Sequence, residues 1–253
     1  MHVVVTGASS GIGEAIARAF SARGDQVTLV ARRQELLESL AKSLPNPSRV
    51  VVADLADPAH AADWLPAAEA AFGPVDVLVN NAGMQVIGPT GEVDIERAEQ
   101  SVRLNLLSPL RLTHALLPAM LARRQGCIVD IASMAALAPT PGMTWYNASK
   151  AGLAAASEAM HGELRGTGVH VVTVYPGIIE TAMGKAGLAA YQPSRIIAMQ
   201  PRGTTEGLAA RVVKAVERRR PRVVYPAIYG SSRWLPPITR WLMDRMTPRL
   251  AEH

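Results

Sequence analysis

The sequence predicts an α/β protein in a single domain, built on a doubly wound, parallel, seven-stranded sheet with helices on both faces. Short runs rich in β-branched residues alternate with longer stretches rich in Ala and Leu along the 253 residues. This alternation is typical of βαβ units, in which each helix leads the chain back to the next parallel strand. The strand-like runs are almost continuously apolar, as over residues 75–79, which indicates strands buried on both faces. No break in composition marks a second domain.

Each expected element follows from one of these two patterns. The apolar runs predict strands near residues 2–6, 26–31, 49–53, 75–80, 126–132, 169–175 and 222–226. Helical periodicity predicts helices near residues 11–23, 33–44, 57–71, 93–122, 145–165 and 204–219. Asp57, which precedes Pro58, is expected to cap the third helix. One domain then spans residues 1–253, with residues 182–203 as an insertion that covers the substrate and residues 234–253 as a C-terminal tail.

Composition and charge exclude several classes of protein. Hydrophobic residues make up 49% and charged residues 19% of the chain, which suits a packed core and argues against disorder. The single cysteine, Cys127, excludes an internal disulfide and a multi-cysteine metal site, and no metal site is expected. The net charge of +5 comes without a recognition motif, so no nucleic-acid partner is expected. With no long apolar run and no leader before residues 2–6, a cytoplasmic protein is expected.

A glycine-rich loop joins the first predicted strand to the first predicted helix. It reads Thr6-Gly7-Ala8-Ser9-Ser10-Gly11-Ile12-Gly13. Glycines allow a tight turn and close approach of the backbone to a ligand, and the helix N-terminus offers unpaired N–H groups to a pyrophosphate. The loop lacks the lysine of nucleotide-hydrolysing P-loops. The residues expected to bind the phosphates of a dinucleotide in this Rossmann-type fold are Gly7, Ser9, Ser10, Gly11, Ile12 and Gly13.

Three polar residues further along the chain suit carbonyl chemistry. Ser133 follows a predicted strand, and Tyr146 and Lys150 lie four residues apart on a predicted helix, so their side chains share one face. Reduction of a carbonyl requires a proton at its oxygen, but an unperturbed tyrosine has a pKa of about 10. A nearby ammonium favours the tyrosinate, so Lys150 is expected to lower the pKa of Tyr146. Ser133 would hydrogen-bond the substrate oxygen.

The glycine spacing of the loop, together with Ser133, Tyr146 and Lys150, resembles the short-chain dehydrogenase/reductase family over most of the chain. The resemblance implies an oxidoreductase that interconverts a carbonyl and a secondary alcohol. It also implies that Tyr146 and Lys150 contact the cofactor and that Asn105 completes the catalytic set through a water-mediated proton relay. An exposed asparagine on a helix is the other interpretation of Asn105.

The same resemblance implies cofactor contacts directly after three later strands. These are Asp54 and Leu55 at the adenine, Asn81, Ala82 and Gly83 at the ribose, and Pro176, Gly177, Ile179 and Thr181 at the nicotinamide. A role in starting the next helix is the other interpretation of Asp54.

The residues after the second strand indicate which nicotinamide cofactor binds. Relatives that bind NAD carry an acidic residue there for the ribose 2′-hydroxyl, whereas this chain has Ala31 followed by Arg32 and Arg33. A guanidinium can bind a 2′-phosphate through two hydrogen bonds. Arg32, with Arg33 as helper, therefore predicts NADP(H). A solvent-exposed pair at a helix start is the other interpretation.

Substrate choice is expected to lie in residues 84–89, 134–143 and 182–203, which are rich in Met, Ala, Leu, Ile and Pro. A hydrophobic pocket and a lipophilic carbonyl or alcohol are favoured. The alternatives are a 3-oxoacyl-thioester reductase, a catalytically silent NADP(H)-sensing protein that binds other proteins, and a sugar-nucleotide epimerase. The chain lacks the Asp-Gly-Gly end of 3-oxoacyl reductases, and all four catalytic positions are filled, which argues against a silent relative.

The C-terminal tail looks more like the hydroxysteroid- or lipid-oxidising branches of the family. Ile238, Trp241, Leu242 and Met246 can share one helix face. This face is expected to dock on the protein body or a second subunit, and contact with a membrane surface is the alternative. The resemblance also implies a homodimer or homotetramer formed through helices 93–122 and 145–165.

Overall fold

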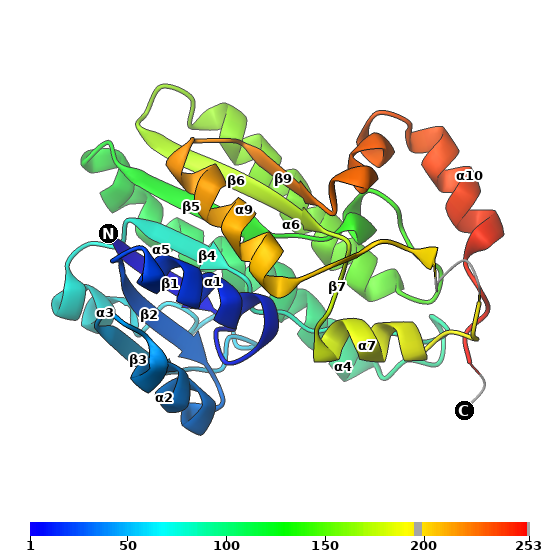
Figure 1. Ribbon diagram of the computed structural model, residues 1–253, viewed down its shortest axis with the longest axis horizontal. Coiled ribbons are helices and arrows are strands. Elements are labelled where there is room, and N and C mark those ends of the chain that lie inside the picture. The colour runs from blue at the N-terminus through cyan, green and yellow to red at the C-terminus, as the bar shows by residue number, and fades with distance from the viewer. Residues whose placement is uncertain (195–198, 252–253) are drawn as a thin grey trace.

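The computed structural model describes residues 1–194 and 199–251 and contains the predicted parallel seven-stranded sheet (Figure 1). The strand order is β3-β2-β1-β4-β5-β6-β9, and every neighbouring pair is parallel. The strands are β1 (His2–Thr6), β2 (Gln26–Ala31), β3 (Ser48–Val52), β4 (Val77–Asn80), β5 (Gly126–Ile131), β6 (Val169–Pro176) and β9 (Arg222–Tyr225). The predicted fold class is confirmed, and each strand lies within about two residues of its prediction.

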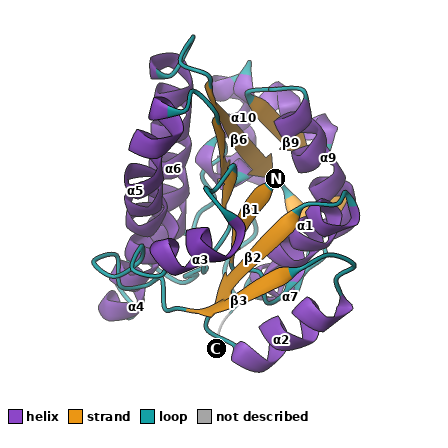
Figure 2. Ribbon diagram, turned by 90° about the vertical axis from the view of Figure 1, so that its left-hand side faces the viewer, coloured by secondary structure: helices purple, strands orange, loops and turns teal. Residues whose placement is uncertain are grey.

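Helices cover both faces of the sheet (Figure 2). One face carries α1 (Gly11–Ala22), α2 (Gln34–Ser43) and α9 (Thr205–Glu217), and the other carries α3 (Leu65–Phe72), α5 (Ser108–Ala122) and α6 (Thr144–Glu163). The predicted helix 93–122 is one continuous helical segment, made of α4 (Ile95–Val102), a π-helical turn (Arg103–Leu107) and α5. This arrangement of layers buries the apolar strands on both sides.

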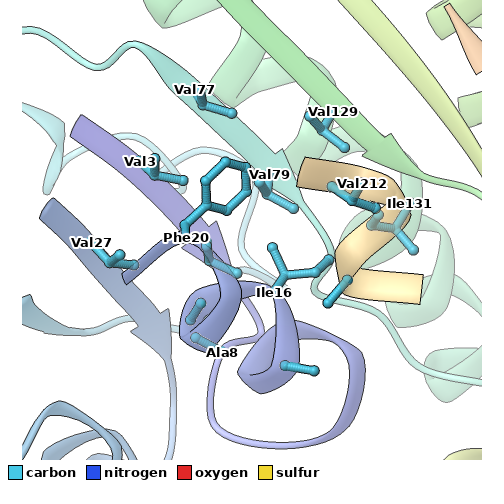
Figure 3. Close-up of a cluster of buried hydrophobic side chains, with 14 of the residues drawn as sticks. Val3, Ala8, Ile16, Phe20, Val27, Val77, Val79, Val129, Ile131 and Val212 are labelled. Carbon is cyan, nitrogen blue, oxygen red and sulfur yellow. The ribbon is translucent and has the colours of Figure 1, made fainter. Parts of the chain in front are cut away.

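The core between α1 and the sheet fixes the glycine-rich loop in place. Ile16 and Phe20 of α1 are fully buried in one cluster with Val3, Val129 and Val212 (Figure 3). Burial of a side chain of this size contributes about 1.5–3 kcal/mol. Because the α1 helix is held from inside the core, its N-terminus stays at the carboxyl end of β1.

The third helix starts later than predicted, at Leu65 instead of near residue 57. The carboxylate of Asp57 accepts a hydrogen bond from the Ala59 N–H at 3.1 Å. The carboxylate of Asp54 likewise accepts one from the N–H of the residue two positions later in the chain. Such local side-chain turns compete with a helix. Pro66 stands in the first turn of α3, where a missing N–H costs least. The prediction that Asp57 caps this helix was therefore wrong.

The strand order reverses between β1 and β4, and this reversal opens a crevice at the carboxyl ends of the strands. Beyond this edge lie α7 (Ala182–Ala189) and α10 (Pro236–Met246) (Figure 1). The two-residue strands β7 (Ile178–Ile179) and β8 (Arg202–Gly203) pair with each other there. An antiparallel bridge between Tyr191 and Leu250 joins the insertion to the tail.

Within residues 1–194 and 199–251, no helix is long and apolar enough to cross a bilayer. The same part of the chain holds no cluster of three or more His, Cys, Asp or Glu side chains suited to a metal. Cys127 is a buried free thiol, as expected from the sequence.

Candidate active site

A cleft of about 950 Å³ opens at the carboxyl ends of the strands. Every residue predicted to bind the cofactor lines it, except Gly13. Ser133, Tyr146 and Lys150 also line the cleft. The fourth predicted catalytic residue, Asn105, is fully buried and lies behind the wall.

The glycine-rich loop has the backbone that its sequence predicts. Gly7 and Gly11 adopt φ of +65° and +60°, a region that other residues rarely occupy. A Cβ on Gly13 would lie 2.4 Å from the Gly7 oxygen and from Asn81 Nδ2, so this glycine serves the packing of the helix on the loop. The Ser10 hydroxyl makes no cap hydrogen bond to α1. The first N–H groups of α1 therefore face the cleft wall without a side-chain cap, as an anion site requires.

Asn81 and Thr6 tie the end of β4 to this loop. Asn81 Nδ2 donates to the Thr6 oxygen at 2.9 Å and to the Gly7 oxygen at 3.3 Å. The Thr6 hydroxyl accepts the N–H groups of Asn81 and Ala82 at 2.9 and 3.0 Å. The predicted phosphate and ribose segments are thus joined into one rigid wall.

The two arginines after β2 occupy different places at the rim of the cleft. Arg33 donates to the hydroxyls of Ser9 and Ser10 at 2.8 and 2.7 Å, so its guanidinium reaches the glycine-rich loop. Arg32 is 65% exposed and lies 3.9 Å from the carboxylate of Asp54. Both cations border the position that a 2′-phosphate would take after β2, and Arg33 is the more tightly placed of the two.

Three of the residues predicted to be catalytic, Ser133, Tyr146 and Lys150, come together at the cleft wall. Tyr146 and Lys150 sit one turn apart on α6 and are 7% and 5% exposed. The Lys150 ammonium donates to the Ile131 oxygen at 2.7 Å. Ser133 begins a short 3₁₀ turn (Met134–Ala136) after β5, and its hydroxyl accepts the Ala135 N–H at 3.1 Å. The Ser133 hydroxyl also hydrogen-bonds the Tyr146 side chain.

Asn105 is not an exposed helical residue. Its amide accepts the Met84 N–H and donates to the Met84 oxygen, both at 2.9 Å, and donates to the Ser149 hydroxyl at 3.0 Å. The π-helical turn directs this side chain inward, as such turns do at many functional sites. A Cβ on Gly83 would lie 3.0 Å from Asn105 Oδ1 and 3.4 Å from the Lys150 ammonium, so the glycine lets these groups approach.

The electrostatics of the site differ from the prediction in one respect. Burial raises the pKa of Tyr146, and hydrogen bonds from Ser133 and Gln85 oppose this rise in part. Lys150 was expected to lower the pKa of Tyr146, but the pKa is raised because burial of the phenol has the largest effect on it. The Lys150 ammonium instead donates its hydrogen bond to the Ile131 oxygen. Burial also lowers the pKa of Lys150 to about 8, and the charge of Asp130 opposes that change.

Two functional-site residues were missed from the sequence. Asp130 on β5 is 1% exposed, accepts from Asn80 Nδ2 at 2.8 Å, and has its pKa raised to about 6 by burial. Gln85 lines the cleft and hydrogen-bonds the Tyr146 side chain. Both depend on contacts between distant segments. The only signal in the sequence was the presence of Gln85 in the predicted substrate region 84–89.

The half of the cleft beyond Tyr146 is largely apolar and carries no charge, although polar side chains such as Gln200, Ser231 and Thr239 also line it. Charged residues among the described lining are confined to Arg32, Arg33, Asp54 and Lys150, all at the cofactor side. Seven of the ten methionines line the cleft, namely Met84, Met134, Met143, Met183, Met199, Met243 and Met246. Methionine is flexible and polarisable, so such a wall adapts to long or irregular apolar ligands.

The tail divides its apolar residues between two sides of α10. Ile238, Leu242 and Met246 line the cleft, as their predicted common face suggests. Trp241 does not line the cleft with them; it is 58% exposed and lies under the guanidinium of Arg245 at 5.6 Å. Ile238, Leu242 and Met246 also remain 53%, 39% and 38% exposed, so the cleft wall does not fully cover the predicted face.

Comparisons with known proteins agree with this geometry. The family model of the short chain dehydrogenases matches residues 1–191. An uncharacterised oxidoreductase of Staphylococcus epidermidis is 36% identical over 180 residues, which cover 71% of this chain and 78% of that protein. A closed serine dehydrogenase solved with NADP+ matches with a TM-score of 0.79 at 29% identity, over 88% of this chain and 94% of the other.

A variant of an actinorhodin polyketide ketoreductase solved with NADPH matches with a TM-score of 0.81 at 31% identity, over 90% of this chain and 97% of the other. One assignment follows from the family model, which matches most of the chain, from the shared fold and from the glycine-rich loop. The chain belongs to the short-chain dehydrogenase family and is an oxidoreductase of that family.

Proposed function

We propose that the protein uses NADP(H) to interconvert a lipophilic carbonyl compound and its secondary alcohol, with Tyr146 as the proton-transfer residue. The observation that carries this proposal is the position of Tyr146. It lies with Ser133 and Lys150 where a wall suited to a dinucleotide meets an apolar, uncharged chamber.

The residues of the first wall fit a phosphorylated dinucleotide. The backbone of Gly7 and Gly11 allows the close approach that a pyrophosphate needs, and a Cβ on Gly7 would already lie 2.8 Å from the Ala82 backbone. Arg33 and Arg32 supply two cations where a 2′-phosphate would lie. Asp54 lies beside Arg32 and is free of any role in starting α3. When bound, the cofactor would donate or accept a hydride at the carbonyl carbon.

In the direction of reduction, the Tyr146 hydroxyl would donate its proton to the carbonyl oxygen. The Ser133 hydroxyl would donate a hydrogen bond to the same oxygen and stabilise its developing charge. Lys150 would stabilise the phenolate that remains on Tyr146. Asn105 would act through the backbone of Met84 and through Ser149 to hold this set of groups in place.

The uncharged chamber favours a neutral substrate. An ionised substrate would lose its hydration without gaining a partner of opposite charge among the described lining residues. This argues against a zwitterionic amino acid. It also argues for a simple lipophilic carbonyl over the 3-oxoacyl-thioester alternative, whose carriers bring anionic groups. Residues 182–203 and 234–253 would cover the substrate, since parts of both segments line the cleft.

A screen of NADPH consumption tests the proposal. Ketones of increasing chain length, steroids and acyl thioesters are offered to the wild-type protein and to Tyr146→Phe, with NADH as the competing cofactor. We expect turnover with the neutral lipophilic ketones, preference for NADPH, and a loss of about 100-fold or more in Tyr146→Phe. Undiminished turnover in that variant would contradict the role of the phenol, and binding of NADPH without any turnover would favour the silent relative.

Association into a homodimer or homotetramer is part of the proposal. Ile95 in α4 and Leu107 in the π-helical turn are 56% and 44% exposed, and a second subunit packed on this helical segment would cover them. Sedimentation of the wild type against a variant with both residues replaced by Ser would show a shift to smaller species.

A further inference from the structure

A strip of buried polar side chains crosses three neighbouring strands beneath α6. Asn80 of β4, Asp130 of β5 and Thr173 of β6 stand directly opposite one another in the register of the sheet. Each of these residues is 1% exposed. Residues opposite one another in a sheet point to the same face, so the three side chains form one polar strip beside an apolar layer of the core.

Two helices close over this polar strip. Asn80 Nδ2 donates to Asp130 Oδ1 at 2.8 Å and to the Thr113 hydroxyl of α5 at 3.3 Å. The Thr173 hydroxyl donates to the Ser157 hydroxyl of α6 at 2.9 Å. The carboxylate of Asp130 is therefore enclosed between the sheet and these two helices, away from solvent.

The helix α6 places the Lys150 ammonium at the end of the same strip. Lys150 and Ser157 are both buried and lie two turns apart on one face of the helix. Ser157 contacts the neighbour of Asp130 on β6. The Lys150 ammonium donates to the oxygen of Ile131, the residue after Asp130, at 2.7 Å. Because a strand rises about 3.3 Å per residue, the carboxylate and the ammonium lie close together on this side of the sheet.

Both buried charges need a partner of opposite sign. The Lys150 ammonium is 5% exposed, and its hydrogen bond goes to a neutral carbonyl. Oδ2 of Asp130 is buried and has no hydrogen-bond partner of normal geometry. Among the described residues, the other carboxylate buried to a similar degree is that of Asp25, which pairs with the Met1 ammonium at the amino ends of the strands. A buried charge without a partner is costly, so Asp130 and Lys150 are each other's available partner.

We propose that Asp130 is a positioning residue, the buried counter-ion that keeps the Lys150 ammonium charged inside the protein. Asn80 holds the carboxylate in place through its hydrogen bond. Asp130 does not line the cleft, so it acts on the reaction only through Lys150. The inference rests on the proposed function and deepens it, because Lys150 stabilises the phenolate of Tyr146 only while it is charged.

The titration of the two groups agrees with this pairing. Burial lowers the pKa of Lys150 to about 8, and the charge of Asp130 opposes this change. Burial raises the pKa of Asp130 to about 6, and the Asn80 hydrogen bond and the charge of Lys150 oppose that rise. Both groups are therefore ionised between about pH 6 and pH 8. The remaining side chains of the strip and of the helices over it do not titrate, namely Asn80, Thr113, Ser157 and Thr173.

NMR of the lysine side chains tests the pairing without any need for turnover. The chain has four lysines, and the other three, Lys42, Lys185 and Lys214, are exposed. Protein isotope-labelled at the lysine ε-carbons therefore gives a separate signal for Lys150, which Lys150→Met assigns. In the wild type we expect a midpoint near pH 8 and a smaller second step near pH 6, where Asp130 takes up its proton. In the isosteric Asp130→Asn variant the midpoint should fall by about one pH unit or more, and the second step should vanish.

Two further variants are the controls for this measurement. Asp25→Asn removes the other buried carboxylate, and Thr173→Val alters the same polar strip without removing a charge. Neither variant should move the midpoint of Lys150. An unchanged or raised midpoint in Asp130→Asn, or an equal shift in Thr173→Val, would overturn the inference. The second step in the wild type needs no variant and decides the question if Asp130→Asn does not fold, since its absence would also overturn the inference.

The pH dependence of turnover shows whether the pairing serves the reaction. At pH 8 about half of Lys150 is charged in the wild type, and about a tenth would be charged in Asp130→Asn. We therefore expect kcat of this variant to fall about fivefold at pH 8 and to stay nearly unchanged at pH 6. An equal loss at both pH values would indicate a purely structural role and contradict the inference. A wild type inactive on every carbonyl would refute the proposed function, whereas the NMR titration would still test the ion pair.

Discussion

Removal of the buried ammonium of Lys150 should stabilise the fold while it abolishes activity. Burial lowers the pKa of Lys150 from 10.5 to about 8. The lysine is charged in the folded and the unfolded chain at pH 7, so the folded state carries a penalty of about 3 kcal/mol from this group. Lys150→Met removes that penalty, which already includes the attraction to Asp130, but it loses the hydrogen bond to the Ile131 oxygen. The net gain expected at pH 7 is about 1–2 kcal/mol.

The pH dependence of this gain separates the electrostatic cause from better packing. The folded pKa of Lys150 lies below its unfolded value, so the wild type recovers stability as pH rises from about 8 to about 10.5. The advantage of Lys150→Met should shrink over the same interval. Urea unfolding curves at several pH values measure both quantities, with Lys42→Met on the exposed side of α2 as the control. Equal or lower stability of Lys150→Met at pH 7, or a gain independent of pH, would refute this reasoning.

Three further predictions concern the rim, the tail and the loop. Arg33→Ala should raise KM for NADPH about tenfold or more without changing KM for NADH, with a smaller effect for Arg32→Ala; equal losses with both cofactors would argue against 2′-phosphate binding. If the exposed side of the tail contacts membranes, replacement of Trp234 and Trp241 by Ala should weaken binding to anionic vesicles and leave the melting temperature unchanged. Unchanged vesicle binding in a sedimentation assay would exclude that contact. Gly13→Ala should destabilise the fold by about 1–3 kcal/mol in thermal unfolding, since its Cβ would clash with backbone, and wild-type stability would contradict the packing role.

Substitutions in the tail test membrane contact more cleanly than deletion of residues 234–253 would. Ile238, Leu242 and Met246 line the cleft, so removal of the tail would also open the substrate chamber. A loss of vesicle binding in such a truncation would have two explanations. The two exposed tryptophans leave the chamber wall intact.

Sequence patterns predicted the features that depend on local spacing. The alternation of strands and helices predicted the parallel seven-stranded sheet, and the positions of Gly7, Tyr146 and Lys150 after a strand or along one helix predicted that they line a common cleft. These properties follow from backbone periodicity, which a single sequence displays directly. The start of α3 was mispredicted because the side chain of Asp57 bonds within its own turn.

Features that depend on contacts between distant segments were not predictable in the same way. The hydrogen bonds between Asn105 and Met84 form only because the fold brings the π-helical turn next to the segment after β4. No local sequence pattern encodes this contact. The rise in the pKa of Tyr146 depends on how deeply the phenol is buried, which spacing along a helix does not reveal.

The segment after α10 takes part in the packing around Tyr146. Leu250 packs against the cluster that contains Tyr146 and Tyr191, and a Cβ on Gly142 would lie 2.9 Å from it. Residues outside the sheet and its covering helices therefore help to set the shape of the cleft beside Tyr146, and a change at Leu250 would reach that side chain through packing alone.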